Sequence, residues 1–256
     1  MRIAIVYSSD PVIMDNYIYS IISKNYKNIK AVIRTEGSIL HKNSLYLKIK
    51  YIITLSLISG FFTTLKNIFH LFTNLVTPSN KVYEVCKSNS IPLFKVSTIN
   101  SKNCKRLLSK SSLDLIFNQS HHIVSKDILA IPKVGILNRH GALLPKYRGR
   151  LSPFWQLLNN ESRGGVTFHL LDEKIDNGPI VYQKPIKIES NESFNSLVSK
   201  IFTEAGEGFS KSISILEKSD WQQYLLPNDV NLSSYYSSPE LRDAFQFLNS
   251  KSRYEK

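Results

Sequence analysis

The sequence has little cysteine and no leader-like start. Its 256 residues include two cysteines, Cys86 and Cys104, whose spacing fits neither a redox pair nor a zinc site. They indicate free thiols in a reducing compartment rather than a disulfide framework. The N-terminus, MRIAIVYSSD, lacks the basic and then apolar layout of a signal peptide. A cytoplasmic location is therefore expected.

Acidic residues are also scarce relative to basic ones. The chain has 33 Lys and Arg against 20 Asp and Glu, which gives a formal net charge of +13. Such an excess favours anionic partners, for example nucleotides, nucleic acid, polyglutamyl tails or acidic lipid. The lysines are scattered rather than clustered, in a chain that is also rich in Asn, Ile and Ser. The charge therefore admits anionic ligands but does not select nucleic acid.

Short apolar segments alternate with stretches of helical length. Such alternation is typical of βαβ units, so we expect an α/β fold with a mostly parallel sheet and helices on both faces. One long helix is predicted over Ser193–Leu216, and a short last helix opens at Ser238-Pro239. The predicted strands are Arg2–Tyr7, Lys30–Arg34, Ile91–Val96, Leu113–Asn118, Val134–Asn138, Val166–Leu171 and Ile180–Ile188.

One segment, Leu40–Val76, is too long to be a single crossover helix. It contains an uncharged run, Tyr51–Leu65, bounded by Lys50 and Lys66. The run is too short and too rich in Ser and Thr for a membrane span. A helical hairpin that turns near Gly60 and packs on the protein or on a second subunit is favoured. The alternative is an interfacial patch that touches a membrane through this face and its flanking lysines.

The candidate catalytic residues lie between Gly135 and Gln183. Asn138 and His140 end a predicted parallel strand, where alternate side chains point the same way and ligands bind in open α/β sheets. Asp176 lies in a turn between two later strands. An amide for an oxyanion, a histidine for proton transfer and an orienting carboxylate suit attack of an amine on a carbonyl-like carbon. The competing interpretation gives all three residues purely structural roles in loops and turns.

Four motifs in order resemble the signature of the folate-dependent formyltransferases. They are Asn138-Arg139-His140, Leu143–Gly149, Gly165–His169 and Asp176–Ile180. The resemblance is strong over residues 113–190 and weaker over the rest of 1–200. It implies a Rossmann-like formyltransferase fold, 10-formyltetrahydrofolate as formyl donor, no metal, and Asn138, His140 and Asp176 as the catalytic set. It also implies that the folate is bordered by two segments, through His122, Ile123, Val124, Leu143, Leu144 and Pro145.

Several residues depart from the family pattern. Gly141-Ala142 replaces the usual Pro-Ser after the catalytic histidine, which predicts a looser loop. The turn Tyr7–Asp10 lacks the glycines with which the purine-pathway enzyme binds phosphate. Only 46 residues follow Ser210, too few for the C-terminal barrel of the tRNA enzyme. By elimination, the acceptor is expected to be a nucleotide-linked amino sugar or a similar small anionic amine.

The predicted organisation is a catalytic domain over residues 1–205, with a helical insertion at about 40–77, and a small extension over 206–256. A methionyl-tRNA formyltransferase-like activity and a formyltetrahydrofolate hydrolase stay open as alternatives, and a homodimer is compatible with both. The adjacent His121 and His122 should diverge and are not expected to bind a metal. His169 either lines the site or is a hydrogen-bonded strand histidine. Nearby basic residues expected to attract an anion are Arg139, Lys146, Arg148 and Arg150.

Overall fold

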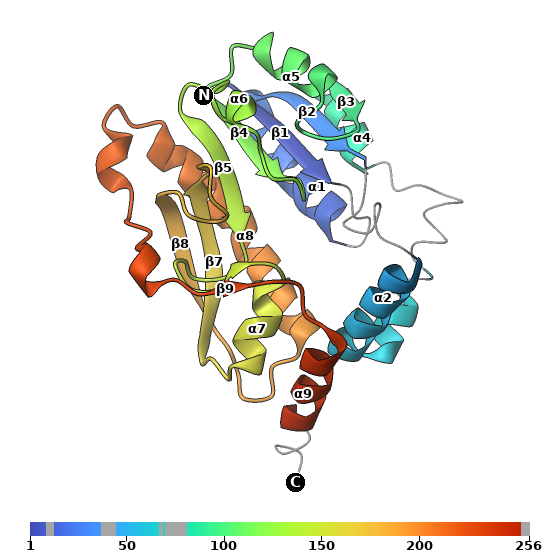
Figure 1. The fold of residues 1–256 in the computed structure, drawn as a ribbon. Helices are drawn as coiled ribbons and strands as arrows, with labels where there is room; N and C mark the ends of the chain where they lie inside the picture. Colours follow the sequence, from blue (N-terminus) through green and yellow to red (C-terminus); the bar gives the residue numbers. More distant parts are fainter. Residues whose placement is uncertain (9–12, 37–44, 67–68, 70–80, 252–256) are drawn as a thin grey trace.

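The computed structural model describes residues 1–8, 13–36, 45–66, 69 and 81–251, and its centre is a seven-stranded sheet (Figure 1). The strand order is β3-β2-β1-β4-β5-β7-β8. The first five strands in this order are parallel, and β7 and β8 continue the sheet antiparallel. The α/β fold with a mostly parallel sheet is therefore confirmed. The strands are β1 (Ile3–Ser8), β2 (Ile29–Thr35), β3 (Leu93–Val96), β4 (Leu115–Gln119), β5 (Gly135–His140), β7 (Arg163–Leu170) and β8 (Ile180–Lys187).

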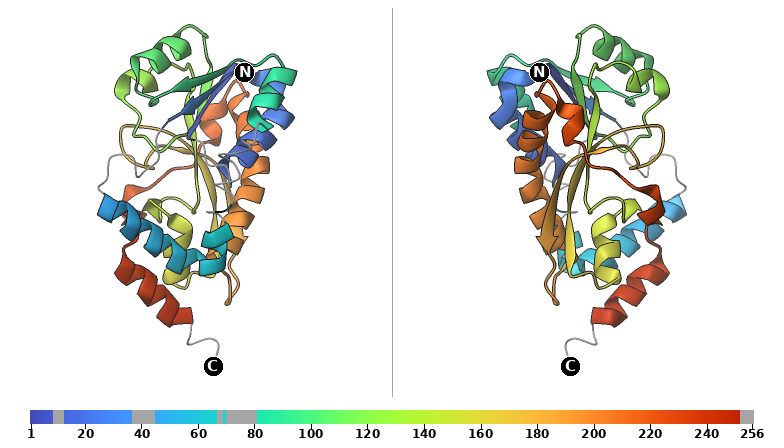
Figure 2. Two further views of the ribbon diagram at one scale, coloured as in Figure 1. Left: turned by 90° about the vertical axis from the view of Figure 1, so that its right-hand side faces the viewer. Right: turned by 90° about the vertical axis from the view of Figure 1, so that its left-hand side faces the viewer.

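Helices cover both faces of the sheet because its central strands are apolar on both sides (Figure 2). In β1, Ile3 and Ile5 pack into the cluster with α1, α4 and α8, whereas Ala4 and Val6 pack into the cluster with α5 and α6. This alternation is the period-2 pattern of a strand buried between two layers. The helices are α1 (Met14–Asn25), α4 (Lys81–Ser88), α5 (Lys102–Ser109), α6 (Lys126–Leu129) and α8 (Phe194–Leu216).

Helix α8 is the longest of the described helices that pack on the sheet. Ser193 caps its N-terminus by accepting a hydrogen bond from the backbone N–H of Ser196. Its buried side chains continue from Leu197 to Leu216 along one stripe. Residue 205, at which we placed the end of the catalytic domain, thus lies in the middle of this helix. The division of the chain into domains stays a prediction.

The described part of the segment Leu40–Val76 is helical. Helix α2 (Leu45–Ser59) ends at Gly60, whose φ of +88° suits glycine, and residues 61–66 are helical again. Ile58 packs in a third apolar cluster with Phe154, Ala244 and Phe247. These residues belong to α7 (Ser152–Leu158) and α9 (Leu241–Lys251). The other residues of the segment, 40–44, 67–68 and 70–76, lie outside the described residues, and within the described ranges no helix is long and apolar enough to cross a bilayer.

After α8 the chain returns across the antiparallel end of the sheet. It forms the short 3-10 helices η2 (Trp221–Tyr224) and η3 (Val230–Leu232), and an earlier one, η1 (Tyr26–Asn28), follows α1. The two-residue strand β9 (Tyr235–Tyr236) then pairs in parallel with β6 (Arg148–Gly149), which lies in the loop after β5. This small second sheet ties the C-terminal segment to the loop that follows Asn138 and His140.

Candidate active site

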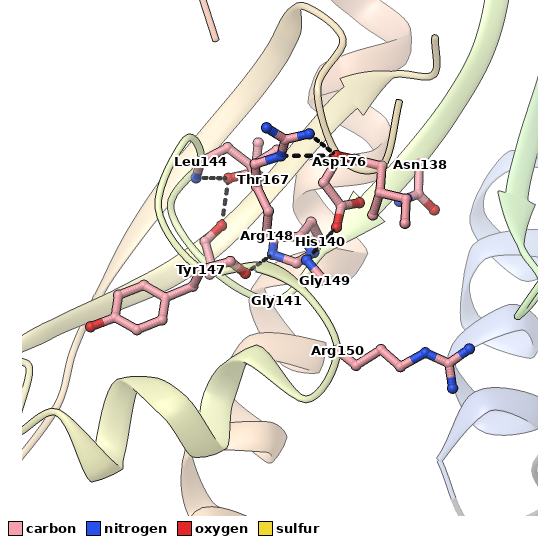
Figure 3. Close-up of polar contacts among 12 residues, drawn as sticks. Asn138, His140, Gly141, Leu144, Tyr147, Arg148, Gly149, Arg150, Thr167 and Asp176 are labelled. Atoms are coloured by element: carbon pink, nitrogen blue, oxygen red, sulfur yellow. Dashed lines mark hydrogen bonds and ion pairs between the residues drawn. The ribbon is translucent and has the colours of Figure 1, made fainter. Parts of the chain in front are cut away.

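The structure brings Asn138, His140 and Asp176 together at the carboxyl end of β5 (Figure 3). Asp176 lies in the connection between β7 and β8. One of its carboxylate oxygens, Oδ2, is 3.5 Å from Nδ1 of His140, and the other, Oδ1, is 3.5 Å from Nε2 of His169. Nε2 of His169 is in turn 3.2 Å from Nδ2 of Asn138. Two histidine rings therefore face a single carboxylate, and the Asn138 amide contacts one of them.

The ring of His140 is buried and held in one orientation. Its Nε2 lies 2.7 Å from the carbonyl oxygen of Tyr147. A carbonyl can only accept a hydrogen bond, so Nε2 carries a hydrogen. Burial lowers the pKa of His140, although the nearby Asp176 carboxylate opposes this effect. The other ring nitrogen, Nδ1, is the atom that faces Asp176.

Asp176 is held as an ionised carboxylate in a strained turn. Its φ is +49°, in the left-handed region, and its backbone oxygen accepts a hydrogen bond of 3.0 Å from Nδ2 of Asn228. The backbone N–H of Gly149 donates to Oδ2 at 2.8 Å. Burial alone would raise the pKa of Asp176, but the rings of His140 and His169 and the Gly149 N–H bring it well below its usual range.

A chain of hydrogen bonds orients the amide of Asn138. Nε of Arg139 donates to Oε1 of Gln119 at 2.9 Å, and Nε2 of Gln119 donates to Oδ1 of Asn138 at 3.3 Å. Nδ2 of Asn138 lies 3.2 Å from Nε2 of His169, whose Nδ1 lies 3.2 Å from the carbonyl oxygen of Leu170. The same Nε2 faces Oδ1 of Asp176. The direction of donation thus places the NH₂ group of Asn138 toward the carboxylate site.

The loop after β5 is fixed by side chains of neighbouring elements. Nε2 of Gln156 donates to the carbonyl oxygen of Gly141 at 2.9 Å, and Oγ1 of Thr167 donates to that of Ala142. The backbone N–H of Leu144 donates to the same Thr167 hydroxyl at 3.2 Å. These hydrogen bonds hold the backbone of Gly141 and Ala142, and the looser loop expected from this pair stays a prediction.

The C-terminal segment forms the outer wall of the same loop. Ser234 accepts hydrogen bonds from the backbone N–H groups of Tyr147 at 2.9 Å, through its hydroxyl, and of Arg148 at 2.8 Å, through its carbonyl. The Tyr236 ring is stacked between Tyr147 and Trp155, with centroid distances of 5.3 and 4.8 Å. Neither Ser234 nor Tyr236 was predicted from the sequence, because no local pattern links Ser234 to Tyr147, 87 positions earlier.

The structure corrects the expected cluster of basic side chains. The guanidinium of Arg139 lies 4.1 Å from the ring centroid of Phe202, on the opposite side of β5 from Asn138 and His140. Arg148 donates to the carbonyl oxygen of Ile175 and is also engaged internally. Lys146 and Arg150 are exposed, and Arg150 extends away from the other labelled side chains in Figure 3. Lys146 and Arg150 are thus the most exposed of the four basic side chains.

The residues predicted to border the folate lie in two segments, after β4 and after β5. Ile123 is 72% exposed, and its carbonyl accepts a 2.8 Å hydrogen bond from Nδ2 of Asn100, which fixes the first segment. His122 is partly buried and Val124 is buried. In the second segment Leu144 is buried, and its carbonyl accepts from Nε2 of Gln183 at 2.8 Å, whereas Leu143 and Pro145 are partly buried. Because β4 and β5 are adjacent and parallel, both segments lie at one edge of the sheet, and folate contact there stays a prediction.

Three chemical groups thus lie at this edge of the sheet: the oriented amide of Asn138, the imidazole of His140 and the ionised carboxylate of Asp176. Within the described ranges no group of three or more His, Cys, Asp or Glu side chains has the arrangement of a metal site. The arrangement can bind a developing negative charge on oxygen through the amide and can accept a proton at the imidazole.

Comparison with known proteins gives a family and a fold. The family model described as Formyl transferase matches residues 73–213, which is more than half of the chain. The bifunctional polymyxin resistance protein ArnA of Wigglesworthia glossinidia brevipalpis is 38% identical over 149 residues, which cover 58% of this chain and 22% of that protein. The methionyl-tRNA formyltransferase of Thermodesulfovibrio yellowstonii is 35% identical over 146 residues, 57% of this chain and 47% of that protein. The chain spans less than half the length of these two relatives.

Solved structures of formyltransferases share the fold over nearly the whole chain. A sugar N-formyltransferase from Shewanella sp FDAARGOS_354 superposes with a TM-score of 0.59 at 14% identity, covering 98% of this chain and 88% of that one. The phosphoribosylglycinamide formyltransferase of Anaplasma phagocytophilum superposes with a TM-score of 0.62 at 14% identity, covering 92% and 98%. At this identity the likeness concerns the fold alone.

Proposed function

Because the chain belongs to the formyl transferase family, we propose that it transfers the formyl group of 10-formyltetrahydrofolate to a primary amine. The observation that carries the proposal is the Asp176 carboxylate, held 3.5 Å from the rings of His140 and His169 beside the Asn138 amide. Asn138, His140 and Asp176 are the proposed catalytic residues. The folate lies along the segments that contain His122–Val124 and Leu143–Pro145.

Asn138 is proposed to hold the oxygen on which negative charge develops. When the amine nitrogen bonds to the formyl carbon, the formyl C=O becomes a tetrahedral oxyanion. Nδ2 of Asn138 lies 3.2 Å from Nε2 of His169, and within the described ranges it makes no other hydrogen bond. An amide already oriented by its neighbours requires no reorganisation to bind the oxyanion, which favours the transition state over the ground state.

His140 and Asp176 are proposed to carry out the proton transfers: His140 takes up a proton, and Asp176 stabilises the charge that results. The amine enters as an ammonium and must lose one proton before its nitrogen can attack. His140 can take up a proton only at Nδ1, since Nε2 already donates to Tyr147. The resulting imidazolium has the Asp176 carboxylate as its counter-charge. The proton then passes to N10 of the folate as the N10–formyl bond breaks, and the second ammonium proton leaves to solvent, so the products are the formamide, tetrahydrofolate and one proton.

For the acceptor we favour a nucleotide-linked amino sugar or a similar small anionic amine. We call the loop after β5, residues 141–151, the catalytic loop. Its exposed cations, Lys146 and Arg150, can pair with one or two phosphates. They do not form the continuous basic stripe that a nucleic-acid footprint needs. The fold is also shared, over 93% of this chain, with WlaRD, a sugar 3N-formyl transferase crystallised in the presence of dTDP and a formyl folate.

A methionyl-tRNA acceptor is the second candidate. Two methionyl-tRNA formyltransferases, those of Thermodesulfovibrio yellowstonii and Syntrophus aciditrophicus, are 35% and 32% identical to the matched region. The net charge of +13 also favours a polyanionic partner.

One assay tests the donor and the acceptor together. The protein is incubated with 10-formyltetrahydrofolate and, in separate reactions at matched salt, a panel of nucleotide-linked amino sugars or charged initiator tRNA, and products are detected by mass spectrometry. We expect formylation of an amino sugar, with a KM raised several-fold in Arg150→Gln and unchanged in the exposed control Arg242→Gln. Formylation of the tRNA alone would select the second candidate. Release of formate without any acceptor would show a formyltetrahydrofolate hydrolase and overturn the proposal.

A further inference from the structure

The helical hairpin of α2 and residues 61–66 exposes large apolar side chains. We call these residues the hairpin face, and their relative exposure ranges from 45% for Ile52 and Ile53 to 84% for Phe62. Soluble monomers seldom expose so many neighbouring apolar side chains without a partner for them. The hairpin face consists of Leu45, Tyr46, Ile49, Ile52, Ile53, Phe61, Phe62 and Leu65; Leu47, which is 46% exposed, lies on the other side of α2 and is not part of it.

Helical spacing places the members of the hairpin face on one side of each helix. On α2 they occupy positions i, i+1, i+4, i+7 and i+8, an arc about 120° wide at 3.6 residues per turn. Thr54 and Ile58 lie on the other side of α2 and are buried against the protein. In the second helix Thr63 faces the protein and accepts a hydrogen bond of 3.2 Å from Nδ2 of Asn195. Each helix therefore contacts the rest of the protein with one side and exposes apolar side chains on the other.

The charge around the hairpin face is of one sign. Lys48 and Lys50 flank the apolar arc of α2 on its two edges by helical spacing, and Lys66 follows Leu65 in the second helix. The sequence contains no acidic residue between Glu36 and Glu84. Lysines beside an apolar face can lay their methylene stems along it and keep their ammonium groups in a polar layer.

From this arrangement we propose that the hairpin face docks the protein on an anionic lipid surface. Apolar and aromatic side chains enter the boundary of the acyl chains, and the flanking lysines contact anionic headgroups. A second copy of the chain is a poorer occupant. A two-fold contact through this face would bring its lysines together without an acidic residue from the same segment to pair with them.

Docking through this face would also bring the catalytic loop close to the lipid. Ile58 of α2 shares an apolar cluster with Phe154 of α7, the helix that begins directly after this loop. An acceptor presented at a membrane surface would then meet the site without leaving the interface.

Vesicle flotation tests the proposal with the full chain. The protein is mixed with vesicles of equal parts phosphatidylglycerol and phosphatidylcholine, or of phosphatidylcholine alone, at low and at high salt. We expect flotation with the anionic vesicles at low salt, and its loss at high salt or with neutral vesicles. The triple variant Phe61→Gln/Phe62→Gln/Leu65→Gln should float only to the level seen with neutral vesicles. The variant Lys48→Gln/Lys50→Gln/Lys66→Gln should behave in the same way.

Matched control variants separate the face from bulk properties. Tyr19→Gln/Tyr26→Gln/Tyr83→Gln removes three exposed aromatic side chains elsewhere, and Lys27→Gln/Lys102→Gln/Lys110→Gln removes three exposed charges. Both should float like the unaltered protein, and thermal unfolding confirms that every variant is folded. Flotation of the hairpin variant equal to that of the unaltered protein overturns the proposal. So does a stable dimer in sedimentation that only the hairpin variant loses, with no flotation of the unaltered protein, because a second copy then covers the face.

Discussion

The backbone N–H of Gly149 donates a 2.8 Å hydrogen bond to the carboxylate of Asp176, and this contact joins the loop after β5 to the turn between β7 and β8. Gly149 has a φ of +100° and pairs with β9. A Cβ atom at this position would lie 2.1 Å from the backbone oxygen of Tyr236. The bond to Asp176 therefore depends on glycine at position 149.

Replacing this glycine should damage both stability and turnover. In Gly149→Ala the new methyl group must push β9 away, and an alanine at this φ is strained, so we expect a loss of about 1–3 kcal/mol in the free energy of unfolding. A displaced Asp176 should lower turnover on the order of a hundredfold. Gly206→Ala is the control, because nothing lies within 4 Å of its added Cβ in α8, and it should stabilise the protein by about 0.5–1 kcal/mol. Urea unfolding and steady-state turnover measure both. Equal effects of the two changes would contradict this account.

The proposed catalytic residues should affect turnover far more than folate binding. We expect His140→Ala and Asp176→Asn each to lower kcat by about two to four orders of magnitude, since these groups act on the transition state. The dissociation constant for a non-reactive folate, measured by calorimetry, should change little. Glu173→Gln, an exposed neighbour in the same connection, should leave kcat unchanged. Turnover near the unaltered level in either catalytic variant would refute the assignment.

The buried histidine predicts a dependence of stability on pH. Burial lowers the pKa of His140 in the folded protein, so the unfolded chain, with a histidine pKa near about 6.5, takes up a proton first as the pH falls. The contribution of His140 to stability is therefore present above that value and decreases below it. Between about pH 7 and about pH 5, His140→Gln should lose less unfolding free energy than the unaltered protein.

Urea titration at several pH values within this interval measures the difference between the two proteins. The lowered pKa of Asp176 acts in the same direction at lower pH, because its stabilising contribution is present above the unfolded aspartate pKa and is lost as the pH falls through the folded one. A steeper decline in His140→Gln than in the unaltered protein would show that the ring is charged in the folded state.

Tyr236 should position the catalytic loop without touching the reacting atoms. Tyr236→Ala removes the ring between Tyr147 and Trp155, and we expect kcat to fall about tenfold to a hundredfold through a misplaced His140. Tyr236→Phe keeps the stack and should restore most of the rate. Tyr235→Ala, whose side chain is 59% exposed, is the matched control and should be nearly silent. If Tyr236→Phe is as slow as Tyr236→Ala, the hydroxyl rather than the stack is responsible.

Local sequence patterns predicted the strands and the placement of Asn138 and His140, because both depend on the two-residue period of a strand. The same period shows why Arg139 was misplaced: a residue between two site residues on a strand faces the opposite side of the sheet. The orienting role of Gln119 was not predictable in this way, since its partners come from neighbouring strands. Ser234 was missed for the same reason, because contacts across long sequence separations follow from the packed fold.

The pairing of β6 with β9 has a consequence for the order in which the protein is made. The loop after β5 is hydrogen-bonded to residues 234–236, which are translated after Asn138, His140 and Asp176. Domains fold as their segments leave the ribosome, N-terminal parts first. A nascent chain can therefore complete its parallel sheet before residues 234–236 have left the ribosome to form the outer wall of the loop after β5.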